Sequence, residues 1–289
     1  MKPGRQSMAH GQQQQTVVAA VQPASRPDAT ALPSWAVPDI TGALPPSAAA
    51  PSPPPPAEHA VPAVDEKLPA TIGNASLRDA AMAGNPAAAY EIANRFAEGR
   101  GVLQNDKQAA YWLQRAAKQG LAPAEFRLGG LYEKGQGVDK DLGKARDLYL
   151  AAADKGNGKA MHNLAVLYAE GVDGQPDYDK AADWFRQAAA HGVRDSQFNL
   201  GILYARGIGV QQNDAESYKW FALAAKQGDA DAAKKRDEIA SHLDAQALAA
   251  AKLAVRNWSP DPQPDDAVNV KLAAAWASPP PASPGAKVK

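Results

Sequence analysis

The sequence predicts an all-α fold in which helix–turn–helix repeats stack into a right-handed α-solenoid. Three observations predict this class. A 36-residue pattern recurs four times without a gap, the apolar residues of each unit follow a helical period, and a turn with glycines separates the two apolar stripes of each unit. A period of this length indicates a repeat array. Because one helical hairpin cannot bury its apolar face alone, the units must stack on one another.

Each unit opens with a glycine and has the same residue types at fixed places. The four units span residues 84–119, 120–155, 156–191 and 192–227. An apolar residue stands at position 9, a small residue at position 10, an aromatic residue at position 13 and a glycine at position 16. The fourth unit shows them as Leu200, Gly201, Tyr204 and Gly207. A large apolar residue at position 29 and an Ala-Ala pair complete the pattern.

Two apolar stripes in each unit predict two amphipathic helices. In the third unit the first stripe is Ala160, Leu164, Leu167 and Tyr168, and the second is Ala181, Trp184, Phe185, Ala188 and Ala189. The glycines between the stripes allow a positive φ where the first helix ends. A carboxylate near the start of the second helix can cap its free N–H groups, and the candidates are Asp106, Asp141 and Asp214.

Composition divides the chain into a folded array and two tails. Residues 1–75 contain 14 of the 24 prolines and no Phe or Tyr. Such a segment cannot bury enough apolar surface to offset its ordering entropy, which predicts a disordered spacer. Residues 76–83 predict a half-repeat that caps the array, and residues 228–257 predict two C-terminal capping helices. Residues 258–289 are again Pro-rich and predict a disordered tail.

Charge and composition exclude several classes of function. The formal net charge is zero and no basic stripe is interleaved with aromatic residues, so we expect no nucleic-acid partner. The absence of cysteine excludes disulfides, thiol nucleophiles and zinc–thiolate sites. His162, His191 and His242 lack the spacing of a metal site. No catalytic motif is present, so we expect no enzyme, no cofactor and no metal.

The chain shows no membrane-spanning or export segment. No stretch approaches the roughly 18 apolar residues of a transmembrane helix. The apolar run from Thr16 to Val21 is too short for the core of a signal peptide, and four glutamines precede it. Taken literally, the sequence predicts a soluble chain without a targeting signal.

The repeat pattern resembles that of the Sel1-like repeats, which are related to the tetratricopeptide repeats. The fourth unit follows the family pattern from Ser196 through Asp214 and Trp220 to Gly228. The third unit departs from it between Gly171 and Pro176, where the Gly-x-Gly-Val turn is missing, so we expect a different turn there. In the resembling superhelices, the outward surface of the first helices lines a concave groove.

The candidate site is this outward surface. Positions 4, 7, 8, 11, 14 and 15 of the first helix point away from the core. From positions 7, 8 and 11, the candidate groove residues are Tyr90, Glu91, Asn94, Phe126, Arg127, His162, Asn163, Phe198, Asn199 and Ile202. The aromatic ladder at position 7 suits a peptide or a glycan. Two alternatives stay open: position 7 packs against the adjacent first helix, and Asn163 and Asn199 are structural hydrogen-bonding groups.

These observations favour a non-enzymatic scaffold or adaptor that holds a peptide or partner protein in the groove. Residues 1–75 and the end of the array from Lys219 to Arg256 also resemble the periplasmic C-terminal region of PodJ-type polar localisation factors. This resemblance implies a bacterial cell-envelope or polar-localisation pathway and a periplasmic or membrane-associated location. The missing targeting signal leaves a cytoplasmic location open. The alternative function is a peptidoglycan-associated regulator of cell-wall machinery.

Overall fold

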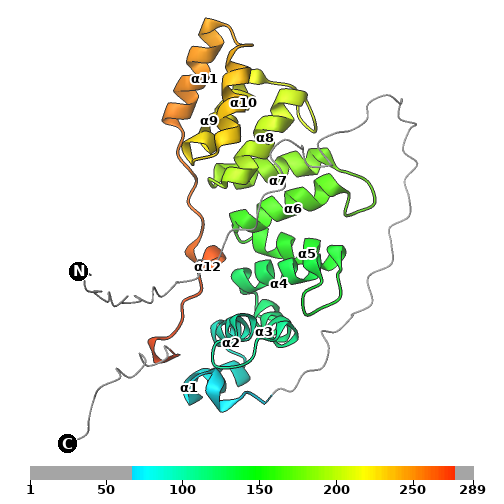
Figure 1. The fold of residues 1–289 in the computed structure, drawn as a ribbon, viewed down its shortest axis with the longest axis vertical. Helices are drawn as coiled ribbons and strands as arrows, with labels where there is room; N and C mark the ends of the chain where they lie inside the picture. Colours follow the sequence, from blue (N-terminus) through cyan, green and yellow to red (C-terminus); the bar gives the residue numbers. More distant parts are fainter. Residues whose placement is uncertain (1–66, 277–289) are drawn as a thin grey trace, which may run out of the picture. The chain divides into compact units, whose positions relative to one another are not determined.

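A computed structural model describes residues 67–276 of the chain. Within this range the regular structure is entirely helical, and successive helices form a stack of antiparallel pairs (Figure 1). The prediction of an all-α solenoid of helix–turn–helix repeats is confirmed. The spacer expected before residue 67 and the tail expected after residue 276 lie outside the described residues.

The repeats supply eight of the helices of the described range. The first helices of the repeats are α2 (Pro86–Glu98), α4 (Ala122–Lys134), α6 (Gly158–Glu170) and α8 (Arg194–Arg206). The second helices are α3 (Asp106–Lys118), α5 (Leu142–Ala153), α7 (Tyr178–Ala190) and α9 (Asp214–Lys226). Before them lie η2 (Ala70–Ile72) and α1 (Ala75–Met82), where the half-repeat was expected. After them lie α10 (Ala230–Ala240) and α11 (Ala245–Asn257), where the capping helices were expected.

The core of each repeat lies between its two helices. At the predicted position 29, Trp112 and Trp220 are buried, and the next place, position 30, is buried in all four repeats as Leu113, Tyr149, Phe185 and Phe221. Position 10 on the first helix faces them. A Cβ atom on Gly201 would lie 2.8 Å from the ring of Phe221. The small residue at position 10 is therefore needed for the two helices to approach this closely.

In the second and fourth repeats, a glycine of the turn lies directly against the backbone of the preceding repeat. A Cβ atom on Gly209 would lie 2.1 Å from the carbonyl oxygen of Tyr178, the first residue of α7. Gly137 makes the equivalent approach to Asp106 on α3. The third repeat differs, because Gly174 has no neighbouring atom within 4 Å. The third turn instead contacts α5 through an ion pair between Arg146 and Asp173. The different turn expected for this repeat is therefore observed.

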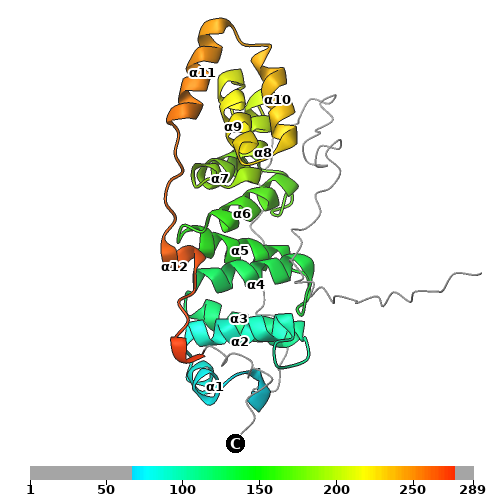
Figure 2. The same cartoon turned by 60° about the vertical axis from the view of Figure 1, so that its left-hand side comes forward.

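Residues 258–276, which we call the return segment, run back along the array. The segment places α12 (Asp265–Val268) against α4 and ends in η3 (Ala274–Trp276) against α1 (Figures 1 and 2). The expectation of a disordered tail from residue 258 is wrong for these residues. Their sequence is rich in proline and aspartate near its start, but contacts with residues as far as 201 positions away hold them.

None of the helices between residues 67 and 276 combines the length and the apolar character needed to cross a membrane.

Candidate partner-binding groove

A hollow of about 1030 Å³, which we call the groove, opens on the surface of the array. It is lined by the first helices of the repeats, by the loops that lead into α6 and α8, and by the return segment. The lining residues are Tyr90, Pro123, Phe126, Arg127, Asn157, Lys159, His162, Asn163, His191, Gly192, Val193, Arg194, Asp195, Gln227, Gln263 and Val268. Its volume is that of a site for a short peptide segment or a small ligand.

The groove contains half of the candidate residues. Tyr90, Phe126, Arg127, His162 and Asn163 line it, and they come from α2, α4 and α6. The other five candidates are Glu91, Asn94, Phe198, Asn199 and Ile202, and they do not line it. The groove is therefore centred on the first three repeats and on the start of the fourth.

The rings at position 7 are half-buried, and three of them pack against the second helix of their own repeat. Ring centroids lie 5.9 Å apart in the Phe126–Tyr149 pair, 5.6 Å in the His162–Phe185 pair and 5.6 Å in the Phe198–Phe221 pair. These three rings thus pack on the second helix, while His162 and Tyr90 also contact the adjacent first helix, through Ser196 and Arg127. These residues contribute to the core, and Phe126 and His162 also line the groove.

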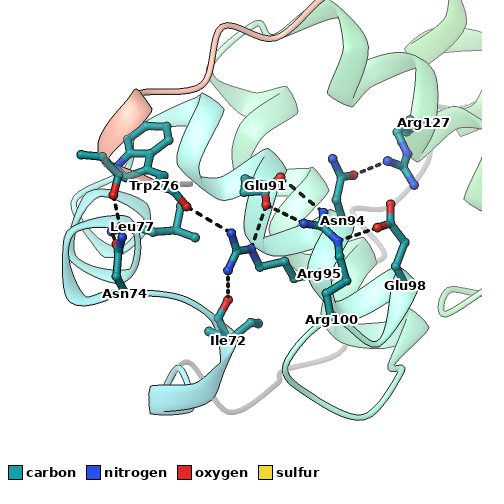
Figure 3. Close-up of polar contacts among 11 residues, drawn as sticks. Ile72, Asn74, Leu77, Glu91, Asn94, Arg95, Glu98, Arg100, Arg127 and Trp276 are labelled. Atoms are coloured by element: carbon teal, nitrogen blue, oxygen red, sulfur yellow. Dashed lines mark hydrogen bonds and ion pairs between the residues drawn. The ribbon is translucent and has the colours of Figure 1, made fainter. Parts of the chain in front are cut away.

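Glu91 is buried and paired, whereas the helical pattern placed it on the outward surface. Its carboxylate accepts a hydrogen bond of 2.8 Å from Nε of Arg95 and forms an ion pair of 3.0 Å with Arg100 (Figure 3). The helical wheel omits η2, the first turn and the return segment, which cover this end of α2. Arg95, itself buried, also donates to the carbonyl oxygens of Ile72 and Trp276.

Tyr90, Asn94 and Arg127 form a cluster that joins the first two repeats. The guanidinium carbon of Arg127 lies 5.7 Å from the centre of the Tyr90 ring. The same guanidinium donates a hydrogen bond to Oδ1 of Asn94 (Figure 3). This cation–π contact and hydrogen bond hold a positive charge at the edge of the groove.

His162 is the titratable group most affected by its place in the groove. Its Nδ1 atom lies 2.8 Å from Oγ of Ser196, a residue with no exposed surface. Burial lowers the pKa of the His162 imidazole below its ordinary value of 6.5, and the nearby Asp195 carboxylate offsets part of this effect. The ring is therefore neutral at neutral pH and supplies an aromatic face and a hydrogen-bonding group rather than a charge.

Asn163 serves the packing of the repeat as well as lining the groove. It is a hydrogen-bond partner of the Tyr149 hydroxyl, whose pKa is raised mainly by burial and further by the Glu133 carboxylate. This contact supports the structural reading of Asn163.

Three charged residues of the groove, Lys159, Arg194 and Asp195, are not among the candidates predicted from the sequence. Lys159 and Arg194 are exposed cations at the starts of α6 and α8, and Arg194 lies 2.9 Å from the carboxylate of its neighbour Asp195. Together with Arg127 they outnumber the single carboxylate, so the groove favours an anionic ligand. Pro123, Lys159 and Asp195 all stand at position 4. This position belongs to the outward surface and could have revealed them.

His162 and His191 both line the groove. Between residues 67 and 276, no group of three or more His, Asp or Glu side chains is arranged to hold a metal ion. His191 caps the end of α7 and donates from Nδ1 to the carbonyl oxygen of Asp261, at 3.1 Å.

The return segment forms one rim of the groove and is held by few contacts. Six hydrogen bonds join it to the array between Ala190 and Asn74. Only Ala267 and Trp276 are buried in it. Each hydrogen bond contributes about 0.5–1.5 kcal/mol net, whereas ordering the backbone costs about 1–2 kcal/mol per residue. The segment is therefore among the parts that open most readily.

The comparisons with known proteins identify the repeats. The model of the Sel1 repeat matches residues 86–121, 122–157, 158–193 and 194–229, each two residues after the start defined by the opening glycine. One similar solved structure is a Sel1 repeat protein from Oxalobacter formigenes. The two sequences are 30% identical. The match covers 62% of this chain and 76% of the Oxalobacter protein, and the TM-score is 0.53. The chain belongs to the Sel1 repeat family.

Two other solved structures are more distant. A protective antigen of uropathogenic Escherichia coli with an SLR fold is 22% identical over 62% of this chain and 54% of that chain, with a TM-score of 0.33. A Sel1 repeat protein from Klebsiella pneumoniae is 21% identical over 57% of this chain and 98% of that chain, with a TM-score of 0.29. No curated protein matches the chain. Sel1 repeat proteins generally mediate protein–protein interactions.

Proposed function

We propose that this protein is a non-enzymatic scaffold whose groove holds an extended, acidic segment of a partner protein. The observation that carries the proposal is the groove itself. Half-buried aromatic rings on neighbouring repeats share one hollow with Arg127, Lys159 and Arg194. The rings offer apolar contact in register along the array, and the cations select carboxylates and orient the segment.

We propose a bacterial cell-envelope or polar-localisation pathway as the setting. The support is the resemblance of the Pro-rich residues 1–75 and of the end of the array to the periplasmic region of PodJ-type factors. In that setting the protein would act in the periplasm or at the membrane. Its role there would be to bring a partner to a defined place rather than to catalyse a reaction.

The test reverses the charge of the groove without touching its core. The bait is the full chain, and the variant is Lys159→Glu combined with Arg194→Glu. Both residues are exposed, so the fold is retained. The matched control is Lys107→Glu combined with Lys118→Glu, which makes the same change in net charge at exposed positions of α3 outside the groove. Each bait captures proteins from an envelope extract.

We expect the wild-type chain and the control to capture the same partner and the groove variant to lose it. Loss from both variants would show that net charge alone governs capture, and capture by all three would place the binding surface elsewhere. Either result contradicts the proposal.

A role in binding peptidoglycan is the second candidate. The observation that favours it is the combination of aromatic rings, Asn163 and cations in the groove, since the strands of the cell wall carry sugar faces and peptide carboxylates. Sedimentation with purified sacculi tests it: retention that the groove variant abolishes supports this candidate, and no retention of the wild-type chain excludes direct contact.

A further inference from the structure

The return segment is bound to the array in the manner of a peptide ligand. Its contacts are made mainly through its own backbone. Asp261 donates from its N–H to the carbonyl oxygen of Ala190, and the carbonyl oxygens of Ala267, Ala275 and Trp276 accept from side chains of the array. Backbone contacts of this kind accept many sequences, and specificity comes from the few side chains that are buried.

The most specific contact is a socket for Trp276. Trp276 is 8% exposed, and its indole ring lies beside Leu77 (Figure 3). The carbonyl oxygen of Trp276 accepts from Nη2 of Arg95 at 3.2 Å, and that of Ala275 accepts from Nδ2 of Asn74 at 2.6 Å (Figure 3). The socket thus binds one tryptophan side chain and two consecutive backbone carbonyl groups.

Two helix-capping asparagines contribute to this surface with their spare amide groups. Asn74 caps α1 and Asn157 caps α6 through Oδ1, which accepts from the backbone N–H three residues on. Their Nδ2 atoms donate to the carbonyl oxygens of Ala275 and Ala267. An aspartate would cap these helices equally well but could not donate.

The chain carries a second sequence that is similar to the one around Trp276. Trp276 stands in Ala275-Trp276-Ala277-Ser278-Pro279, and Trp35 stands in Ser34-Trp35-Ala36-Val37-Pro38. Both have a small residue before the tryptophan, an alanine directly after it and a proline three residues after it. None of the four other tryptophans has this context.

We propose that the socket is a peptide-docking surface for which the Trp35 sequence competes with Trp276. The N-terminal part of the chain enters the array at η2, beside the socket, because Arg95 bonds the carbonyl oxygens of both Ile72 and Trp276. The 31 residues from 36 to 66 can span up to about 100 Å, so reach does not limit docking. The tether raises the local concentration of Trp35 at the socket.

Docking of Trp35 releases the return segment. Gln263 and Val268 of that segment line the groove, so the exchange would open one rim of it. This consequence rests on the proposed function of the groove, whereas the docking itself does not.

The first experiment measures binding of a fluorescein-labelled peptide of residues 30–42 by anisotropy. The protein is the full chain with Trp35→Ala and Trp276→Ala, which empties the socket of both sequences, with its helicity checked by circular dichroism. We expect saturable binding that weakens at least tenfold when Asn74→Asp is added, because the cap remains but the donor is lost. Asn105→Asp, at a helix cap away from the return segment, should leave binding unchanged.

Three results would overturn the proposal: no saturable binding, equal binding of a peptide with Trp35→Ala, or equal binding to the Asn74→Asp chain. A second measurement leaves the socket intact. Hydrogen exchange of residues 258–276 is compared in the wild-type chain and in the single variant Trp35→Ala. We expect exchange at least threefold slower in the variant, because the competitor is gone, and unchanged exchange would contradict the competition.

Discussion

A histidine stands at position 7 of the third repeat, where the second and fourth repeats carry phenylalanine. His162 packs on Phe185 in the way that Phe126 packs on Tyr149. The histidine therefore keeps the aromatic contact and adds a hydrogen-bonding partner for Ser196. Having histidine in place of phenylalanine also makes the stability of this repeat depend on pH, because burial in the folded state favours the neutral form of the ring.

We predict that His162 makes the array less stable in mild acid. Because burial lowers the pKa of His162 in the folded state, the unfolded chain binds more protons as the pH falls through 6.5. The free energy of unfolding should therefore decrease below this pH. His162→Phe combined with Ser196→Ala should flatten this dependence, measured by urea unfolding at several pH values.

The control for this prediction is His242→Gln, which changes an exposed histidine. It should retain the wild-type pH dependence. An equal pH dependence in the wild-type chain and in the His162 variant would show that other groups cause the effect.

Some residues that cap helices also have two roles, as His162 does. Asp106, Asp141 and Asp214 were the capping candidates predicted from the sequence. Asp141 does cap α5, but Asn105 and Asn213 cap α3 and α9, and the aspartates follow as the first helical residues. Asparagine matters most where its amide group has a second task, as it does in Asn157.

We predict that Asn157→Asp loosens the return segment without affecting the array. The carboxylate still caps α6, but the hydrogen bond to the carbonyl oxygen of Ala267 is lost. A hydrogen bond contributes about 0.5–1.5 kcal/mol, so exchange of residues 258–276 should speed up by about two- to tenfold. The midpoint of thermal unfolding should stay nearly constant. Asn105→Asp is the control, and equal exchange in the two variants would contradict the assigned contact.

At the scale of the element, the turn between the two helices decides how closely the repeats stack. Gly209 must be glycine for two reasons: its φ is positive, and a side chain would strike the backbone of α7. Gly174 in the third repeat has a positive φ but open space around it. The comparison therefore separates backbone strain from steric contact between repeats.

We predict that Gly209→Ala destabilises the protein far more than Gly174→Ala. A left-handed conformation costs an alanine about 1–2 kcal/mol at either site. At Gly209 the clash with Tyr178 adds to it, for a total of about 3 kcal/mol or more. Chemical denaturation measures both. Equal losses would mean that the turn relaxes and that the glycine contact does not set the stacking.

At the scale of the whole molecule, the repeat period made the helices and their order predictable. Each repeat buries its apolar stripes against its own partner helix and its neighbours, so local pattern and tertiary contact agree. The same holds for the aromatic residues of position 7, of which Tyr90, Phe126 and His162 line the groove.

The contacts that the sequence did not reveal are long-range and not periodic. The return segment is held by Asn74, Arg95 and Asn157, which lie more than 100 residues away from their partners. Glu91 is buried because η2 and the first turn surround α2, and no helical wheel contains those neighbours. Lys159 stands at the outward position 4, whereas the predicted groove residues stand at positions 7, 8 and 11.

The most direct test of the binding account is the affinity of the captured partner for the full chain, measured by titration calorimetry. The account predicts that Lys159→Glu combined with Arg194→Glu weakens binding at least tenfold, since each charge-assisted contact contributes about 1.5–3 kcal/mol. Lys107→Glu combined with Lys118→Glu should bind as the wild-type chain does. Equal affinity of all three proteins would contradict the assignment of the groove as the partner-binding site.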